Sequence, residues 1–328
     1  ADVRSFFQLL FQQARRGKRL AIIDEFPELM SQGRPADSVL AGVMEEELGS
    51  SRLKLLLCGS HVSTMEGLLA ARNPLHGRGH RFQVTPLTFR QAQLFLKGHT
   101  GPDLIERYAV AGGMPLYLQR LARKAPLKTV IAEDMLSRFG LLFDEPREIL
   151  EMELSNTAIY FSLLAALASH RNLSWDDLVA ESKVEDSTAS RYIRTLEDLH
   201  LVEAYNPLFA QPRERKRRYR MRDPLMRFWF RFVFPIQEEL AAGASAADHF
   251  RRNIEPYFAD HVAPAFEDIC RAWVRECFGA RVDAVGAWWG LARNDLRRAK
   301  LRSSEEIDIV AAAGRKVLVA GEVKWSRQ

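Results

Sequence analysis

The sequence predicts a mixed α/β protein in which an N-terminal α/β core precedes a mainly helical region and a C-terminal α/β segment. Two short apolar runs, 20–23 and 53–58, the second interrupted by Lys54, are typical of strands buried on both faces of a parallel sheet. Helical patterning follows over 103–153, and a strand hairpin is expected at about 306–325. Because 328 residues are too many for one compact core, we expect two or three domains.

The composition is that of an ordinary soluble globular protein, with 47% hydrophobic and 27% charged residues. The three cysteines, Cys58, Cys270 and Cys277, have no metal-ligand spacing, and their odd number disfavours a disulfide framework. No signal peptide is recognisable, and the longest apolar stretch, 159–168, is about half of the ~20 residues that cross a bilayer. We therefore expect a cytoplasmic protein with no membrane partner.

The pattern of apolar runs and breakers divides the chain into four segments. A third apolar run, 82–84, is expected to be a strand, and a helix over 88–97 completes an α/β domain at 1–100. Residues 101–153 are predicted to be a helical lid that contains a Gly-Gly-Met-Pro turn at 112–115. Three helices, a hairpin and a bridging helix are expected over 154–240, and the Ala/Gly/Ser-rich stretch 241–247 is typical of a linker to 248–328.

The first apolar run ends in Asp24 and Glu25, and this is how P-loop ATPases place two carboxylates at the carboxyl edge of a sheet. In that chemistry the aspartate holds the shell of a magnesium ion and the glutamate polarises the attacking water. A strand that runs into a solvated turn would show the same two acids. Further motifs follow in order, namely Cys58-Gly59-Ser60, a Pro-Leu-His-Gly-Arg run that ends at Arg78, and Gly-Met-Pro at 113–115.

This ordered set resembles the archaeal-type ATPase family, a STAND-like branch of the P-loop NTPases related to AAA+ proteins. The resemblance covers nearly the whole chain and implies ATP and Mg²⁺ as cofactors, with Asp24 as magnesium ligand and Glu25 as catalytic residue. It also implies that Ser60 is the polar sensor, that Pro115 packs near the adenine, and that Arg78 approaches the phosphates. The implied fold is a P-loop NTPase core, a winged helix-turn-helix and a restriction-endonuclease-like segment.

The phosphate-binding loop of that family is missing. The pattern G-x-x-x-x-G-K-[ST], whose backbone and lysine cradle the phosphates, does not occur in the chain. Without it two carboxylates face the phosphates with no compensating positive charge, and a central strand of the family's sheet is absent. We therefore expect an incomplete P-loop core, an incomplete version of a longer protein, and no ATPase activity from the chain as given.

The segment 154–240 is predicted to bind DNA. On the helix over 186–199, Ser187, Arg191 and Arg194 share the face opposite the apolar stripe, and such side chains suit the major groove and its phosphates. The hairpin concentrates positive charge, and its candidate DNA-binding residues are Arg215, Lys216, Arg217 and Arg218. A solvated basic hairpin, or a module that binds proteins, remains the alternative.

The C-terminal hairpin places Asp308 opposite Glu322 and Lys324, which share one strand face. An aspartate followed by Glu-x-Lys on the neighbouring strand is similar to the core of the PD-(D/E)XK nucleases. Two carboxylates can hold a divalent metal and the lysine can activate water. The predicted metal ligands are Asp308, Glu322 and Glu267, the last of which lies on a preceding helix. Glu322 and Lys324 are the predicted catalytic residues. A cross-strand salt bridge or an inactive fold would show the same sequence pattern.

These segments together predict an ATP-gated DNA-binding or DNA-cleaving regulator. The rival interpretation is a non-enzymatic DNA-binding or scaffold protein with vestigial ATPase and nuclease sites. DNA is the expected partner in both, and self-association stays open.

Overall fold

The computed structural model describes residues 2–31, 35–47, 49–60, 62–211, 216–291 and 304–326. The chain forms two compact units, Ala1–Val84 and Thr85–Gln328. The boundary precedes the one expected at residue 100, and the second unit contains the predicted lid, hairpin and C-terminal segments. Within the described ranges no helix is both long enough and apolar enough to span a membrane.

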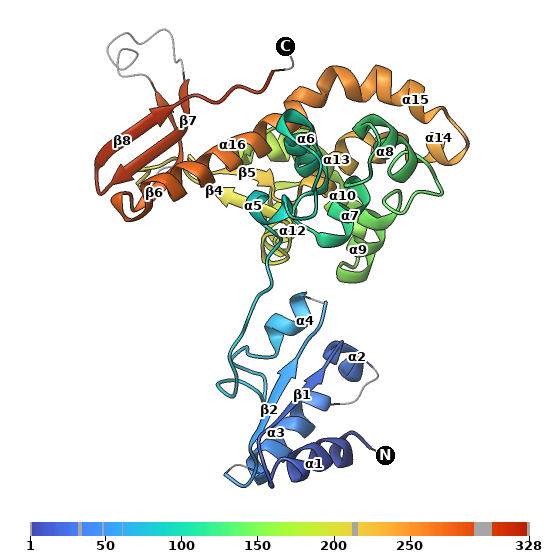
Figure 1. Ribbon diagram of the computed structural model, residues 1–328, viewed down its shortest axis with the longest axis vertical. Helices are drawn as coiled ribbons and strands as arrows, with labels where there is room; N and C mark the ends of the chain where they lie inside the picture. Colours follow the sequence, from blue (N-terminus) through green and yellow to red (C-terminus); the bar gives the residue numbers. More distant parts are fainter. Residues whose placement is uncertain are drawn as a thin grey trace. The chain divides into compact units, whose positions relative to one another are not determined.

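The first unit is a small parallel α/β arrangement (Figure 1). Its strands, β1 (Arg19–Ile23) and β2 (Leu53–Leu57), are both predicted runs, and they pair in parallel from Arg19↔Leu53 to Ile23↔Leu57. The helices are α1 (Val3–Gln13), α2 (Phe26–Ser31), α3 (Ala36–Glu47) and α4 (Val62–Gly67). Phe7, Phe26 and Leu40 form the centre of the core, against which Leu55 packs.

The predicted third strand is wrong, because residues 82–84 form no strand. Phe82 and Val84 are 85% and 84% exposed, since no strand of the described residues offers them backbone hydrogen bonds. The described sheet therefore has two strands, and it is not buried on both faces as expected. Leu20, Ile22 and Leu56 remain 65%, 60% and 48% exposed.

The second unit begins with α5 (Phe89–Ala92), which is shorter than the helix expected over 88–97. The helices α6 (Gly101–Ala111), α7 (Pro115–Leu121), α8 (Leu127–Asp134) and α9 (Glu145–Glu153) follow at the positions expected for the lid. The Gly-Gly-Met-Pro turn joins α6 to α7, and the amide of Leu87 donates to the carbonyl of Gly113 at 2.8 Å. A Cβ at Gly113 would overlap the backbone of Leu87, so this close approach requires glycine.

The next segment contains three helices and a small antiparallel sheet. The helices are α10 (Thr157–Ser169), α11 (Trp175–Ser182) and α12 (Asp186–Asp198). The strands are β3 (Leu173–Ser174), β4 (Val202–Tyr205) and β5 (Arg218–Met221), in the spatial order β3-β5-β4. Ser174 caps α11 by accepting from the amide of Asp177. The predicted hairpin is thus β4 and β5, with β3 as an additional strand.

Helix α13 (Pro224–Phe232) is the centre of the second unit, with seven of its nine residues buried. It packs against α6 and α10, and the indole of Trp229 donates to the carbonyl of Phe143 at 2.7 Å. The predicted bridging helix is divided, because a 3₁₀ turn (Phe234–Ile236) that contains Pro235 separates α13 from α14 (Gln237–Ala241). A short α15 (Ala246–His249), a π-turn (Phe250–Ile254) and a 3₁₀ turn (Glu255–Tyr257) follow.

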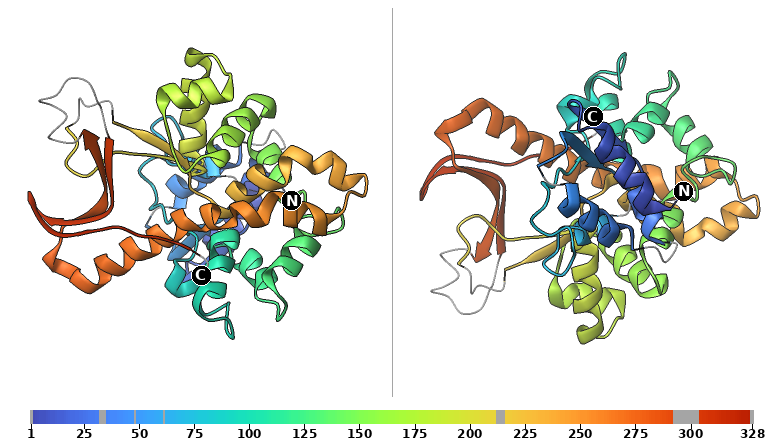
Figure 2. Two further views of the ribbon diagram at one scale, coloured as in Figure 1. Left: turned by 90° about the horizontal axis from the view of Figure 1, so that it is seen from above. Right: turned by 90° about the horizontal axis from the view of Figure 1, so that it is seen from below.

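A long helix and a curved sheet complete the chain. Helix α16 (Phe258–Phe278) runs from the helical core to the antiparallel sheet β6-β7-β8 (Figures 1 and 2). Its strands are β6 (Ala284–Leu291), β7 (Ser304–Ala313) and β8 (Lys316–Gly321), with a 3₁₀ turn (Gly279–Arg281) before β6. The predicted C-terminal hairpin is β7–β8; β6 was not expected.

The buried His261 of α16 predicts how stability depends on pH. Burial, then the charges of Arg227 and Arg231, lower the pKa of His261 well below its usual value. Its Nε2 lies 3.0 Å from the carbonyl of Ala109, so the neutral ring donates there. The unfolded chain, with a histidine pKa of about 6.5, binds the extra proton first as pH falls, so stability is complete above about pH 6.5 and declines below it.

We therefore expect the free energy of unfolding to fall by up to about 1.4 kcal/mol per pH unit from pH 6.5 downwards because of His261. In His261→Gln, which keeps a donor for Ala109, this slope should shrink. It should not vanish, because burial also lowers the pKa of His249. Urea unfolding between about pH 5 and pH 8 measures it. An unchanged slope in the variant would show that His261 titrates normally in the folded protein.

Candidate functional site

The structure brings three of the predicted nucleotide-site residues together at the carboxyl ends of β1 and β2. Glu25 has a positive φ of 48° and turns its carboxylate across to the end of β2. There it accepts from the hydroxyl of Ser60 at 3.1 Å and from its amide at 3.3 Å. Asp24 lies beside it and accepts from the Glu25 amide at 3.1 Å. Both acids are exposed, so a cation or a water could reach them.

The other two predicted nucleotide contacts are not part of this group. The guanidinium of Arg78 pairs with Glu45 of α3, and its Nε donates to the carbonyl of Pro74 at 3.0 Å. These contacts hold Arg78 beside α3, and they would compete with a phosphate for its guanidinium group. Pro115 begins α7 in the other compact unit, where it is exposed. Its place beside an adenine stays a prediction from the resemblance.

The exposed face of α12 has the predicted chemistry. Ala189, Ile193 and Leu196 are buried, and Arg191 and Arg194 lie on the exposed face. The preceding turn is acidic, and the predicted contact residue Ser187 donates its hydroxyl to the carboxylate of Glu185 at 2.7 and 2.8 Å. The helix therefore exposes two arginines, and the nearby hydroxyl of Ser187 is already hydrogen-bonded to Glu185.

The hairpin arginines differ from the expectation of an open basic surface. Arg218 pairs with Glu306 at 3.0 Å and lies 4.6 Å from the centre of the Trp289 ring, both on the C-terminal sheet. The indole of Trp289 donates to the carbonyl of Lys216 at 3.0 Å, and Arg217 pairs with Glu197 of α12 at 2.8 Å. The predicted contact Arg215 lies outside the described residues. The strands of the hairpin thus contact β6 and β7 of the C-terminal sheet, and no local sequence signal predicted these contacts.

Asp308 and Glu322 lie near each other in the C-terminal segment, but β8 ends at Gly321, before Glu322 and Lys324. Asp308 on β7 is buried, and its Oδ2 accepts from the amide of Val323 at 2.9 Å. Desolvation, the charge of Asp308 and a hydrogen bond with Asp308 raise the pKa of Glu322. The positive charge of Lys324 acts on this pKa in the opposite direction. Asp308 is therefore near enough to act on Glu322, which follows the last residue of β8 and is exposed.

Arginines surround the acids where a metal was expected. Arg171, from the connection between α10 and β3, pairs with Glu267 and, at 3.1 Å, with Asp308. Arg271 of α16 lies 3.5 Å from Glu267, and it donates to the carbonyl of Asp308 at 2.8 Å. In the described part of the chain, no group of three or more His, Cys, Asp or Glu residues could hold a metal ion. The arrangement places guanidinium groups, each a fixed positive charge, on Glu267 and Asp308, two of the three predicted metal ligands.

Arg171 was missed because nothing in its local sequence distinguishes it from a surface arginine. It contacts Asp308 across 137 positions of the chain. Only the packing of the three-helix segment against α16 and β7 brings the two together.

Comparison with known proteins finds similarities to a family model, to a relative and to a solved structure. Residues 229–328 match a family model, DUF234, described as archaea bacterial proteins of unknown function. An uncharacterized protein, MJECL04, of Methanocaldococcus jannaschii is 24% identical over 315 residues, which span 94% of this chain and 67% of the relative. Among solved structures, the chain is similar to the Walker-type ATPase PABY2304 of Pyrococcus abyssi, with a TM-score of 0.48, 17% identity, and 70% and 68% of the two chains covered.

Removing Arg171 should reveal how much the buried acids depend on it. Burial already raises the pKa of Glu267, and loss of the Arg171 charge should raise it further. A raised pKa of Glu267 in the folded protein lowers stability only at pH values where the same carboxyl group is ionised in the unfolded chain. The loss of stability in the variant should therefore grow as pH rises. We expect Arg171→Ala to cost about 1–3 kcal/mol at pH 7 and clearly less near pH 4.5.

Urea unfolding at both pH values is the measurement. The matched control is Arg251→Ala, which removes a surface ion pair with Asp248. The control should change stability by less than about 1 kcal/mol at either pH. A penalty for Arg171→Ala that does not depend on pH would mean that packing, and not charge, explains its role.

Proposed function

We propose that the protein is a DNA-binding regulator in which residues 154–240 form a winged helix that reads duplex DNA through α12. The order α10-β3-α11-α12-β4-β5, with the sheet order β3-β5-β4, is the one expected of a winged helix. In that fold the third helix enters the major groove. The observation that carries the proposal is that α12 buries one apolar stripe and exposes Arg191 and Arg194 on the other side.

The local charges support the proposal in part and define its limits. Helix α12 also carries acids, which would repel phosphates if they were free. Glu197 is paired with Arg217, and Glu185 accepts from the hydroxyls of Ser187 and Thr188. Since β4 and β5 also pack against the C-terminal sheet, we assign the main contacts to α12 and fewer to the wing.

Binding to a labelled duplex of about 20 base pairs tests the proposal by fluorescence anisotropy. We expect affinity to fall with salt, because each phosphate contact releases bound counterions. Arg191→Ala combined with Arg194→Ala should weaken binding and reduce the log–log salt slope by about 0.9 for each phosphate that the variant no longer neutralises.

Arg251→Ala, an exposed arginine on the π-turn after α15, serves as the matched control and should bind as the wild type does. If the control weakens binding as much as the α12 variant, the attraction is non-specific. No binding at low salt would favour the alternative that this segment is a protein-binding module.

A second candidate function is nucleotide binding at the end of β1 and β2. The hydrogen bond between Glu25 and Ser60, with Asp24 adjacent, matches the acid–sensor pairing of a P-loop ATPase. Mg²⁺ would be held by Asp24, and the phosphates would need positive charge from elsewhere because the lysine-bearing loop is missing. We propose that this is half of an ATP site, and that the nuclease-like acids serve structure in this chain.

The chain by itself should therefore not bind ATP tightly. Titration with a fluorescent ATP analogue in the presence of magnesium should show no saturation at micromolar concentrations. Asp24→Ala should leave the titration unchanged. Micromolar affinity that disappears in Asp24→Ala would instead show that another segment of the chain supplies the phosphate contacts.

A further inference from the structure

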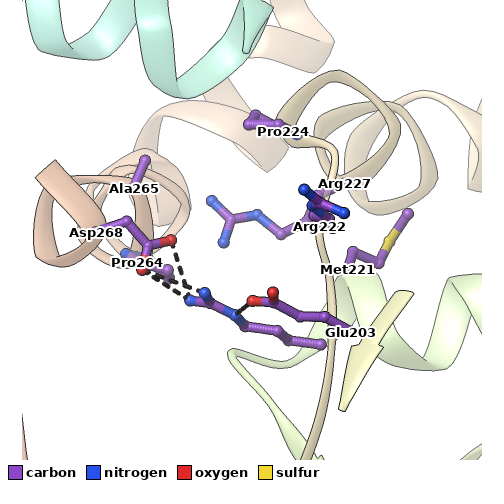
Figure 3. A pocket seen from close by; sticks show the side chains of 9 residues that line it. Glu203, Met221, Arg222, Pro224, Arg227, Pro264, Ala265 and Asp268 are labelled. Atoms are coloured by element: carbon purple, nitrogen blue, oxygen red, sulfur yellow. Dashed lines mark hydrogen bonds and ion pairs between the residues drawn. The ribbon is translucent and has the colours of Figure 1, made fainter. Parts of the chain in front are cut away.

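A polar cavity of about 200 Å³ lies in the second unit where β5 leads into α13 and faces α16 (Figure 3). Its walls include three arginines and two acids, namely Arg220, Arg222, Arg227, Glu203 and Asp268. The apolar part of the wall comes from Met221, Pro224, Pro264 and Ala265. The volume is far above the roughly 10–15 Å³ that one water needs on this measure, so a small molecule could enter.

Arg227 is the unusual member of this wall, because it is a buried charge with no carboxylate partner among the described residues. Only 8% of it is exposed. One Nη donates to the carbonyl of His261, whereas the buried Nε finds no hydrogen-bond partner in the described part of the chain. Burial, and then the charge of Arg220, lower the pKa of Arg227 to about 10. A buried guanidinium in this state is costly unless an anion accompanies it.

The acids of the cavity do not fill that role, because they are committed to other arginines. Glu203 pairs with Arg220, and Asp268 pairs with Arg220 at 3.1 Å and with Arg271 at 2.8 Å. The dashed lines in Figure 3 end on the labelled carboxylates of Glu203 and Asp268, and they mark their bonds to the unlabelled guanidinium group of Arg220. Arg227 and the exposed Arg222 are thus left as the cations that face the cavity.

We propose that this cavity binds a phosphate-type oxyanion, with Arg227 and Arg222 as its ligands. Guanidinium groups form strong, directional hydrogen bonds to phosphate oxygens. A tetrahedral oxyanion has acceptors in several directions and can therefore meet arginines that come from both α13 and the loop before it. A planar carboxylate, in contrast, is satisfied by a single guanidinium fork.

The phosphate group could be free in solution or belong to the end of a nucleic acid, and the chemistry of recognition is the same. The same protein can be measured with a probe for each source. Inorganic phosphate is the first probe, and a DNA hairpin with or without a 5′-phosphate is the second. A preference for the phosphorylated hairpin that depends on Arg222 assigns the DNA end, and no preference assigns the free anion.

The test measures the melting temperature of the full chain against phosphate concentration, with chloride at matched ionic strength as reference. We expect a saturable rise with phosphate, as mass action requires for a ligand of the folded state, and none with chloride. Arg222→Ala should weaken the apparent affinity about tenfold, as for the loss of one charge-assisted hydrogen bond. Arg251→Ala should leave it unchanged.

Arg227→Gln should abolish the phosphate response if the variant folds, which circular dichroism checks. Arg222 is exposed, so Arg222→Ala carries the test even if Arg227→Gln does not fold. Equal effects of phosphate and chloride would overturn the proposal, and so would wild-type affinity in Arg222→Ala. Because DNA binding through α12 is measured separately with Arg191 and Arg194 variants, either proposal can fail without the other.

Discussion

The burial of α13 is the constraint on which the second unit depends. Its aromatic side chains fill the space between α6 and α10, where Phe161 meets the rings of Trp229 and Phe230 edge-on at 6.5 and 5.4 Å. Loss of a buried tryptophan or phenylalanine of this kind costs about 3–5 kcal/mol. The same helix carries Arg227. Its charge is buried because the apolar residues on either side of it in α13 are buried in the core. The polar cavity is therefore a consequence of how the core closes.

Ion pairs join the C-terminal segment to the three-helix segment, and they differ in which member of the pair is buried. Arg171 is about half exposed, but its partners Glu267 and Asp308 are buried, so the loss of Arg171 leaves charge in a poorly hydrated place. Arg220 is the reverse case, because the arginine is the more buried partner, at 20% exposed against 34% for Glu203 and 48% for Asp268. These pairs position β7 and α16 beside the hairpin, and they occupy carboxylates that would otherwise be available to a metal.

The first unit illustrates how a sheet depends on its neighbours. Parallel sheets are normally covered on both faces, and the apolar residues of β1 and β2 suit that environment. Here α1 and α3 cover one face, and Leu20 and Ile22 lie exposed on the other. The acids at the strand ends still reach Ser60, because that geometry needs only the two strands that are present.

Local pattern was enough to predict β1, β2, the three helices over 157–198 and the two hairpins, because helix and strand periodicity is a property of neighbouring residues. It also predicted that Asp308 lies near Glu322, although the paired register of β7 and β8 stops at Ile309 and Gly321, one residue short of both. It failed at β6, where two glycines weaken the strand signal, and at 82–84, where an apolar run finds no strand to pair with among the described residues.

The partners of those elements were decided by tertiary structure alone. The ion pair of Arg171 with Asp308, the stacking of Arg218 on Trp289 and the burial of Arg227 beside His261 join residues from separate elements. They arise from the way α13 and α16 pack, and no local periodicity encodes that packing. The sequence by itself therefore determined which groups could carry chemistry, and the fold decided which of them are free to do so.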